Sequence, residues 1–364
     1  MKKIKTVANT GRIALVMVGT VVGAGFASGA EIKAYFVQYG EAGLWSIGLA
    51  GLLFFLGTYG VLKIAYEHGD REYGAFTERI AGKWPGAVLD ALVTFSMLLG
   101  YGVMLAGSDA VFLQQWDLPA PAGSFFMAGC CAAALCGGSK GILAVNGILT
   151  PILIAGIILV SIYSIWIAPS VSETVGLSLQ PLSVITAQPL KSVGDAFMGA
   201  VIYASYNMLG MGAVLVGFSG FIHTKREAAA VGVQTAVILM TLTFGLGLAT
   251  FLNYDTIVNI PIPVLELLQS CEFGKRVYVF VLLGAMYTTA ISNGFGFMNR
   301  IQALWPMKRG ILWLGMTMTA LLLSRAGFTE LVDDGYRILG YVGSVQLMLI
   351  VVHSFLKKEK INGK

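Results

Sequence analysis

Charged residues are scarce in this chain. Only 12% of its 364 residues are Asp, Glu, Lys or Arg, whereas soluble domains carry about 25%. Hydrophobic residues make up 56%, and the mean hydropathy is +0.77. A soluble fold of this length cannot hide so much apolar surface, so the lipid bilayer is the expected solvent. The apolar runs are long and continuous, which predicts an all-α integral membrane protein.

Histidine and cysteine are also rare, with three and four copies. They form no metal-ligand spacing, and no nucleophile is clustered with a base. We therefore expect neither an enzyme nor a resident cofactor. The formal net charge of +5 lies in short loops between apolar runs, so it does not indicate binding to nucleic acid. The residues in question are His68, His223, His353, Cys130, Cys131, Cys136 and Cys271.

The apolar runs predict ten membrane spans in a single transmembrane domain. The first run is kept as a mature span and not a signal peptide, because it carries Glu31 and Lys33 and has no clean cleavage site. A span needs roughly 20 residues, so the fourth and ninth are short. The predicted limits are 9–38, 42–67, 86–114, 121–137, 141–168, 191–220, 226–252, 276–304, 309–325 and 334–355.

The distribution of Lys and Arg predicts the orientation. Cytoplasmic loops are enriched in these residues. With the N-terminus inside, all but six of the 24 Lys and Arg residues fall in cytoplasmic segments. An even number of spans with both termini in the cytoplasm is therefore expected, in a multi-pass protein of the plasma membrane. The six exceptions are Lys33, Lys191, Lys275, Arg276, Arg325 and Arg337.

Three polar stretches interrupt the apolar pattern. Residues 67–86 predict a short amphipathic helix on the cytoplasmic face, and residues 253–275 predict a short helix over an outer vestibule. Residues 168–189 form an outer loop that divides the spans into two sets of five. This division predicts two repeats, one at about 9–168 and one at about 191–355.

The first span carries the stretch "VGTVVGAGFASGAEI" at 18–32, which is rich in glycine. A dinucleotide-binding loop would need a preceding strand and an acidic residue about 20 residues later, and both are missing. Glycine costs about 1 kcal/mol relative to alanine in a helix, so this span is expected to unwind near Gly23–Gly25. The break would free N–H groups that suit a carboxylate and carbonyls that suit a cation. Close helix packing through small residues is the alternative explanation.

The sixth span is expected to be broken in the same way. Many secondary transporters consist of two inverted repeats whose first helices are interrupted near the midplane. The span reads "DAFMGAVIYASYNMLGMGAVLVGF", and "YASYN" at 203–207 interrupts its apolar run with polar and small residues.

The motif "GAGFASG" resembles the first-span signature of the amino acid–polyamine–organocation superfamily, and the longer stretch at 18–32 resembles an uncharacterised family of bacterial membrane proteins placed in it. The resemblance implies the leucine-transporter fold, with ten helices in a five-plus-five inverted repeat and helices 1 and 6 discontinuous. One departure concerns the substrate class. Many amino-acid transporters of the superfamily have an acid after an aromatic-rich stretch of span six, where Asn207 stands here.

The same resemblance implies where a solute would bind. Its carboxylate would meet N–H groups near Gly25 to Ala27, and its amino group would meet carbonyls between Tyr203 and Asn207. Aromatic residues in membrane helices more often serve packing alone. The candidate substrate-binding residues are Gly23, Ala24, Gly25, Phe26, Ala27, Ser28, Tyr101, Tyr203, Ser205, Tyr206 and Asn207.

A coupling cation is the second implied ligand. In sodium-coupled relatives, a hydroxyl pair on span eight meets carbonyls of the broken first span. The alternative is that these hydroxyls bond to carbonyls of their own helix. Span five has no Lys at mid-depth, which favours Na⁺ over H⁺, although Glu31 could carry a proton or form a gate with Asp195. The candidate cation ligands are Gly19, Val22, Ala285, Thr288, Thr289 and Ser292.

Together these features predict a secondary active transporter of a small amino acid or related amine. Na⁺ is the expected coupling ion, and spans one, two, six and seven would rock against the rest in alternating access. A proton-coupled carrier and a membrane ligand sensor that does not transport remain open. The expected partners are a small-molecule solute and the lipid bilayer, and the sequence indicates no protein partner.

Overall fold

The structure is a computed structural model that describes residues 2–137, 139–168 and 192–356. Every regular element in these ranges is a helix, and the predicted outer loop at 168–189 lies outside them except for its first residue. The long helices are α1 (Lys2–Val21), α4 (Glu41–His68), α6 (Lys83–Trp116), α7 (Ala122–Gly137), α8 (Ser139–Ile167), α10 (Val193–Phe218), α11 (Lys225–Leu252), α14 (Glu272–Leu304), α15 (Arg309–Ser324) and α17 (Tyr336–Val351).

The expectation of apolar membrane helices is confirmed. In the described ranges, six helices are long and apolar enough to cross a membrane, and four shorter apolar helices fall in the remaining predicted spans. The shorter ones are Thr10–Val21, Ala122–Ala132, Pro151–Ile167 and Arg309–Ser324. The count of ten crossings and the inverted repeat stay predictions.

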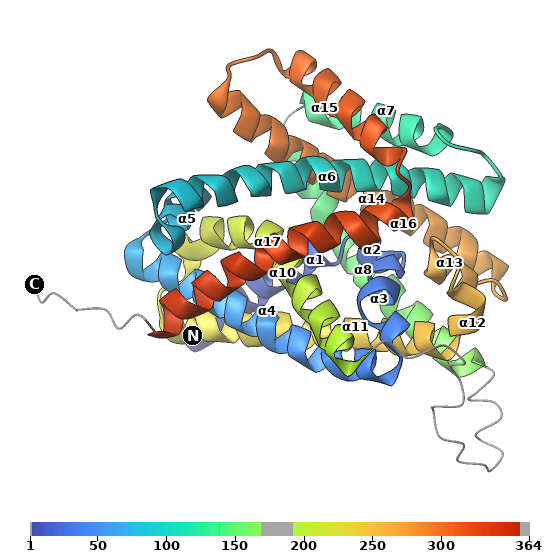
Figure 1. Cartoon of the computed structure of the whole chain (residues 1–364), viewed down its shortest axis with the longest axis horizontal. Coiled ribbons are helices and arrows are strands. Elements are labelled where there is room, and N and C mark those ends of the chain that lie inside the picture. The colour runs from blue at the N-terminus through green and yellow to red at the C-terminus, as the bar shows by residue number, and fades with distance from the viewer. Residues whose placement is uncertain (1, 138, 169–191, 357–364) are drawn as a thin grey trace, which may run out of the picture.

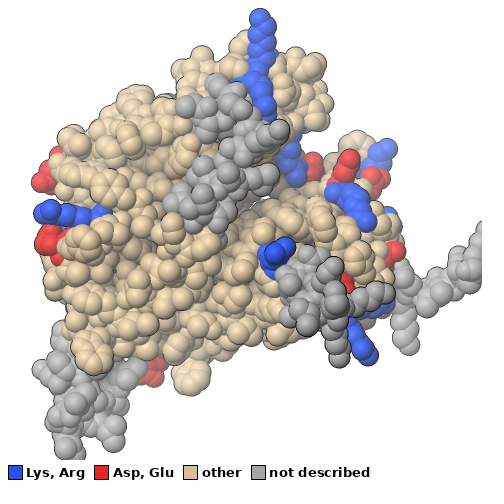
Figure 2. All heavy atoms as spheres, turned by 180° about the vertical axis from the view of Figure 1, so that it is seen from behind, with Lys and Arg blue, Asp and Glu red and all other residues tan. Residues whose placement is uncertain are grey.

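The surface has the distribution expected for a protein in lipid. Figure 2 shows one face on which charged side chains gather toward two opposite ends, with a broad uncharged belt between them. Large apolar side chains are exposed, among them Phe280 at 70% and Trp166 at 82%. In water such a surface would promote aggregation, whereas acyl chains solvate it.

α4 meets the C-terminal part of the described chain at one end of the bundle (Figure 1). There the Lys63 amine donates to the Ser354 carbonyl, and the rings of His68 and His353 lie 6.1 Å apart. The predicted amphipathic helix is present at this end as α5 (Tyr73–Ala81). The predicted short outer helices are α12 (Tyr254–Ile257) and α13 (Pro263–Leu267), which lie at the opposite end.

The first span is broken twice. α1 ends at Val21, and Gly23 is extended with φ −92° and ψ −166° before the single turn α2 (Ala24–Ala27). A second break follows at Gly29, whose φ of +80° lies in the left-handed region that favours glycine. The chain then continues as α3 (Ala30–Tyr35). The predicted interruption near Gly23–Gly25 is therefore confirmed, and the Gly29 break was not foreseen.

The predicted break in span six is wrong. α10 is helical from Val193 to Phe218 and includes the whole of 203–207. Two polar side chains of this segment find partners without unwinding: Asn207 Nδ2 donates to the Tyr203 carbonyl over 3.0 Å, and Ser205 Oγ accepts from Ser344 over 3.1 Å. Span one carries glycines at the break itself, whereas 203–207 contains none. Polarity alone therefore does not break a helix in lipid.

The unbroken α10 lies at the centre of the bundle, against α4 and α17. Glycines of the neighbouring helices make this close approach possible. A β-carbon on Gly343 would collide with the backbone of Ser205, and one on Gly340 would lie 2.8 Å from the Ile202 carbonyl oxygen. This packing holds the tyrosines of α10 against the broken first span.

Candidate functional site

The first break leaves backbone groups without partners at the centre of the protein. Gly23 N–H donates to the Val21 carbonyl, and Ala27 N–H donates to the Gly23 carbonyl. Among the described residues no backbone hydrogen bond reaches the carbonyls of Gly19, Thr20 and Val22 or the N–H groups of Ala24, Gly25 and Phe26. Unpaired peptide groups are costly where water is excluded. This is the pattern of open carbonyls and open N–H groups expected from the sequence.

The second break is held by one side chain and one backbone N–H from elsewhere in the chain. Tyr278 Oη of α14 donates to the Ala27 carbonyl over 2.7 Å, and the Val264 N–H of α13 donates to the Ser28 carbonyl over 3.1 Å. Ser28 Oγ in turn donates to the Gly25 carbonyl over 2.8 Å. α2 is therefore fixed from both sides although it has only one turn.

Glu31 lies directly over this turn. A β-carbon on Gly25 would be 2.8 Å from Glu31 Cδ and would overlap the carboxyl. Glu31 is 5% exposed, and its Oε2 has no hydrogen-bond partner. None of the ion pairs between described residues includes it. The site therefore contains a buried carboxyl whose charge is balanced by no described side chain.

Four tyrosine rings that pack against one another lie near the carboxyl. Tyr35 lies 5.9 Å from Tyr203 and 5.7 Å from Tyr206 between ring centroids, and Tyr206 stacks on Tyr336 at 4.8 Å. We call Tyr35, Tyr203, Tyr206 and Tyr336 the tyrosine box. All four are within electrostatic reach of Glu31, and the Tyr206 hydroxyl lies beside its carboxyl. The hydroxyls of Tyr203 and Tyr206 are buried. Tyr206 Oη faces the Glu31 carboxyl and Tyr203 Oη faces Thr243, but neither reaches hydrogen-bonding geometry with a described group.

The predicted substrate residues divide into two groups. Those of span one, from Gly23 to Ser28, lie at the break, and Tyr203 and Tyr206 face them from α10. Tyr101 does not point at the break, because its Oη lies 3.4 Å from Thr317 Oγ1 on α15. Ser205 and Asn207 are engaged in the hydrogen bonds within and beside α10 described above.

Of the span-eight hydroxyls, Thr289 lies beside the break. A β-carbon on Gly23 would be 3.2 Å from its Oγ1, and no described group hydrogen-bonds to that hydroxyl. Thr288 Oγ1 instead donates to the Ala285 carbonyl over 2.9 Å, as the alternative interpretation of this pair allowed. Ser292 is on the exposed side of α14. The oxygens around a cation would therefore come from Thr289 and the open carbonyls of Gly19 and Val22.

Asp195 is not a buried counterpart of Glu31. It is exposed at the start of α10, where it forms a capping box with Ser192. It also lines a cavity of about 320 Å³ together with Tyr35 and Arg337. We call this cavity the outer cavity. It adjoins the tyrosine box, because Tyr35 belongs to both.

Three site residues were missed from the sequence. Tyr35 and Tyr336 were overlooked because aromatic residues at span ends usually mark the membrane interface. Lys33 was assigned only to the outer side. Its Nζ donates to the carbonyls of Val258 and Ile260 over 3.1 and 2.9 Å, which ties α3 to the segment between α12 and α13.

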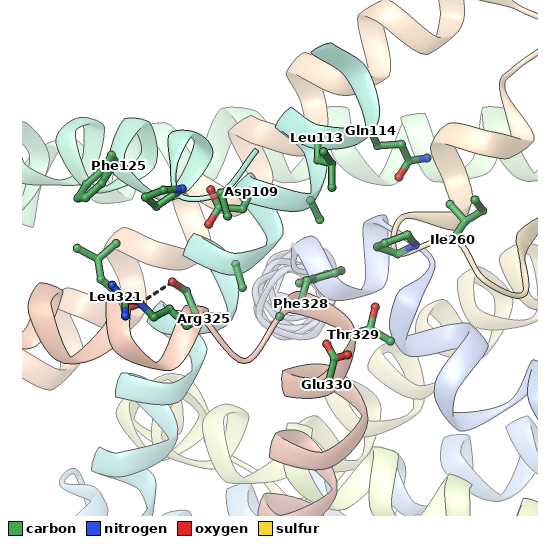
Figure 3. Close-up of a pocket in the computed structure, with 17 residues that line it drawn as sticks. Asp109, Leu113, Gln114, Phe125, Ile260, Leu321, Arg325, Phe328, Thr329 and Glu330 are labelled. Atoms are coloured by element: carbon green, nitrogen blue, oxygen red, sulfur yellow. Dashed lines mark hydrogen bonds between the residues drawn. The ribbon is translucent and has the colours of Figure 1, made fainter. Parts of the chain in front are cut away.

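A larger cavity of about 770 Å³ lies away from this site, between α6, α7, α15 and α16 (Phe328–Glu330). Figure 3 shows Asp109, Arg325 and Glu330 around it. Asp109 Oδ1 accepts the Ser124 N–H over 2.8 Å, so this acid caps the start of α7. None of the predicted site residues lines this cavity.

Polar contacts close the opposite end of the bundle. Tyr73 Oη of α5 donates to Gln346 Oε1 of α17 over 2.8 Å, and Arg300 of α14 pairs with Asp90 of α6 over 2.6 Å. Burial raises the pKa of the Tyr73 phenol above its usual value, so this hydroxyl stays a donor. These contacts join three predicted spans below the site.

No protein-family model matches the chain. Two proteins of Bacillus subtilis strain 168 are similar over nearly its whole length. The uncharacterized membrane protein YkvI is 26% identical over 338 residues, which cover 91% of this chain and 92% of YkvI. The uncharacterized protein YyaD is 26% identical over 357 residues, which cover 95% of this chain and 97% of YyaD.

Solved structures share the fold at low sequence identity. MhsT in complex with L-phenylalanine has a TM-score of 0.61 at 19% identity, covering 94% of this chain and 88% of MhsT. Inward-facing Mhp1, a nucleobase-cation-symport-1 family transporter, has a TM-score of 0.63 at 14% identity, covering 95% and 76%. A manganese transporter of Eremococcus coleocola has a TM-score of 0.58 at 15% identity, covering 96% and 78%.

These comparisons establish the fold and the cellular setting. The chain has the leucine-transporter fold and is similar to membrane proteins over nearly its whole length. Together with its apolar helices, this makes it a multi-pass membrane protein. The proteins that share its fold include transporters of different solutes. In the part of the chain that the structure describes, no three His, Cys, Asp or Glu side chains gather to hold a metal ion.

Proposed function

We propose that this protein is a secondary active transporter of a small amino acid or related amine. The observation that carries the proposal is the twice-broken first span, whose open N–H groups and carbonyls lie at the centre of a chain with a transporter fold. Such half-helix ends bind substrates and ions in transporters. A fixed structural role alone would leave these peptide groups unpaired at a considerable cost in free energy.

Na⁺ is the proposed coupling ion. The carbonyls of Gly19 and Val22 and the hydroxyl of Thr289 offer neutral oxygens, which suit a weakly held hard cation. A proton is the second candidate, and the observation in its favour is the buried, unpaired carboxyl of Glu31. Both ions would act at the same broken span.

Transport would proceed by alternating access. In this proposal the repeats at about 9–168 and 191–355 are related by inversion, and spans one, two, six and seven rock against the others. Both termini lie in the cytoplasm and the protein resides in the plasma membrane. Because α10 is unbroken, the first span supplies the backbone groups of the site, and α10 contributes side chains.

Uptake into proteoliposomes tests the function. Purified protein is reconstituted, and a panel of radiolabelled amino acids and amines is supplied under an inward Na⁺ gradient, an inward H⁺ gradient or neither. We expect concentrative uptake of at least one solute under the Na⁺ gradient. Solute binding without any flux under all three conditions would instead identify a ligand sensor.

A further inference from the structure

We propose that the site accepts a solute with a single positive charge, a primary monoamine without an α-carboxylate, which Glu31 and the tyrosine box hold. This inference rests on the proposed transport function and narrows its substrate class. It begins from the charge of the site. Glu31 is buried, and it has no ion-pair partner among the described residues.

Neither of two basic side chains of this region, Lys33 and Arg337, forms an ion pair with Glu31. Lys33, two residues along α3, directs its amine to the carbonyls of Val258 and Ile260. Arg337 lines the outer cavity beyond Tyr35. A buried carboxylate without a partner is strongly unfavourable, so a cation is expected to enter with the solute.

The position of Glu31 also disfavours a zwitterionic amino acid. The carboxyl occupies the space above Gly25, beside the N–H groups that would otherwise receive a substrate carboxylate. Two carboxylates at this point would repel each other, and burial strengthens that repulsion. A solute that carries only the ammonium group avoids this repulsion.

The number of open acceptors fits an ammonium group. Such a group has three N–H donors and no acceptor. Glu31 and the box together supply three buried oxygens without a hydrogen bond of good geometry: Glu31 Oε2, Tyr206 Oη and Tyr203 Oη. Tyr206 Oη is the one beside the carboxyl, whereas Tyr203 Oη lies toward Thr243. Each hydroxyl can turn its hydrogen away and present a lone pair to the solute.

The aromatic rings suit the same ligand. Centroid distances of 4.8 to 5.9 Å join Tyr35, Tyr203, Tyr206 and Tyr336 into one wall. Cations bind over tyrosine faces, and the attraction grows when water is excluded. The rings also provide apolar surface for the hydrocarbon part of an amine. Tyr35 lines the cavity of about 320 Å³ as well as the box, and its hydroxyl donates to the Val332 carbonyl over 2.9 Å.

Matched pairs of solutes test the inference on the full-length protein. Isoamylamine is compared with L-leucine and phenethylamine with L-phenylalanine, because each pair differs only by the α-carboxylate. Binding is measured by calorimetry in lipid nanodiscs. We expect at least one amine to bind about tenfold more tightly than its amino acid, a difference of about 1.4 kcal/mol. Equal or tighter binding of both amino acids, or no binding of either amine, overturns the inference.

Variants then assign the charge to Glu31. Glu31→Gln keeps the side-chain shape, and we expect it to weaken amine binding by at least about tenfold. Tyr206→Phe removes one acceptor and is expected to weaken it about threefold to tenfold. Gly210→Ala, on α10 with open space around it, serves as the control and should bind as wild type does. Unchanged amine binding by a folded Glu31→Gln variant overturns the inference, and the wild-type comparison keeps it testable if that variant does not fold.

Flux separates this inference from the proposed function. If the protein binds the amine but takes it up under none of the gradients, the cation site is supported and the proposed transport function is refuted. If the protein takes up the amino acids and Glu31→Gln does not change that uptake, the transport function is supported and the cation site is refuted.

Discussion

The Glu31 carboxyl takes the place that a side chain at Gly25 would fill, so a residue with a β-carbon at position 25 would overlap the carboxyl. A residue of the second half-helix thereby reaches back over the turn that precedes it. The glycine serves to admit this carboxyl, in addition to favouring the break.

Gly25→Ala is therefore expected to disable the site. The added methyl group would push the Glu31 carboxyl out of its position, since the two would overlap. We expect solute uptake to fall at least about tenfold, a loss of about 1.4 kcal/mol or more. Uptake assays measure this effect, and Gly210→Ala, whose methyl group meets no atom within 4 Å, should leave uptake unchanged. Equal activity of both variants would contradict the geometry.

Thr289 and Thr288 give a matched pair for the coupling ion. Thr289→Val removes the hydroxyl beside Gly23, so about tenfold more Na⁺ should be needed for half-maximal uptake. Thr288→Val removes a hydroxyl that bonds to its own helix, so it should leave the Na⁺ dependence close to wild type. The measurement is uptake against Na⁺ concentration at constant ionic strength. A larger effect at Thr288 than at Thr289 would place the ion elsewhere.

Tyr278→Phe tests the support of the second break. It leaves the Ala27 carbonyl without its donor, and an unsatisfied buried group costs about 1–3 kcal/mol. Thermal unfolding in detergent should show a lower melting temperature. Tyr287→Phe on the same helix removes a hydroxyl that forms no hydrogen bond with described residues, and it serves as the control. Similar melting temperatures for the two variants would show that the bond adds little.

Tyr73→Phe tests the contacts at the end of the bundle that holds α5. Gln346 is 1% exposed and would lose the donor to its Oε1. We expect a cost of about 1–3 kcal/mol and faster hydrogen–deuterium exchange in α5. Because burial raises the pKa of Tyr73, its contribution is present below the usual tyrosine pKa of about 10 and is lost as the pH rises through the raised value. The difference from wild type should therefore stay constant between about pH 6 and pH 9, and a difference that varies over that range would argue against this contact.

The location of the chain ends can be tested with fusions. The excess of Lys and Arg at the end that holds α5 predicts that both termini are cytoplasmic. A fluorescent protein fused after Lys364 should mature, whereas alkaline phosphatase at the same position should stay inactive in bacteria. The opposite result would reverse the proposed orientation.

The first of the two glycine-directed breaks could be predicted from the sequence, because glycine acts on its own backbone, whereas the break at Gly29 depends on the contacts that α13 and α14 make there. The break at Gly23 and the limits of the long helices follow from local composition and hydropathy. The supposed break at 203–207 could not be judged from the sequence alone, because Ser205 accepts from Ser344 only once α10 and α17 are packed. Asn207 bonds to the Tyr203 carbonyl of its own helix, so its polarity does not require a break. The tyrosine box was also invisible, because it joins residues 35, 203, 206 and 336 across the fold.

The attachment of residues 258–264 to the first span has a mechanical consequence. Lys33 grips the carbonyls of Val258 and Ile260, and the Ser28 carbonyl accepts the Val264 amide. The segment that joins α12 to α13 and the segment that bears Glu31 are thus fastened to one another. A movement of residues 258–264 would therefore also displace the Glu31 side chain. Opening of this side of the protein and a change at the binding site would then be one coupled motion.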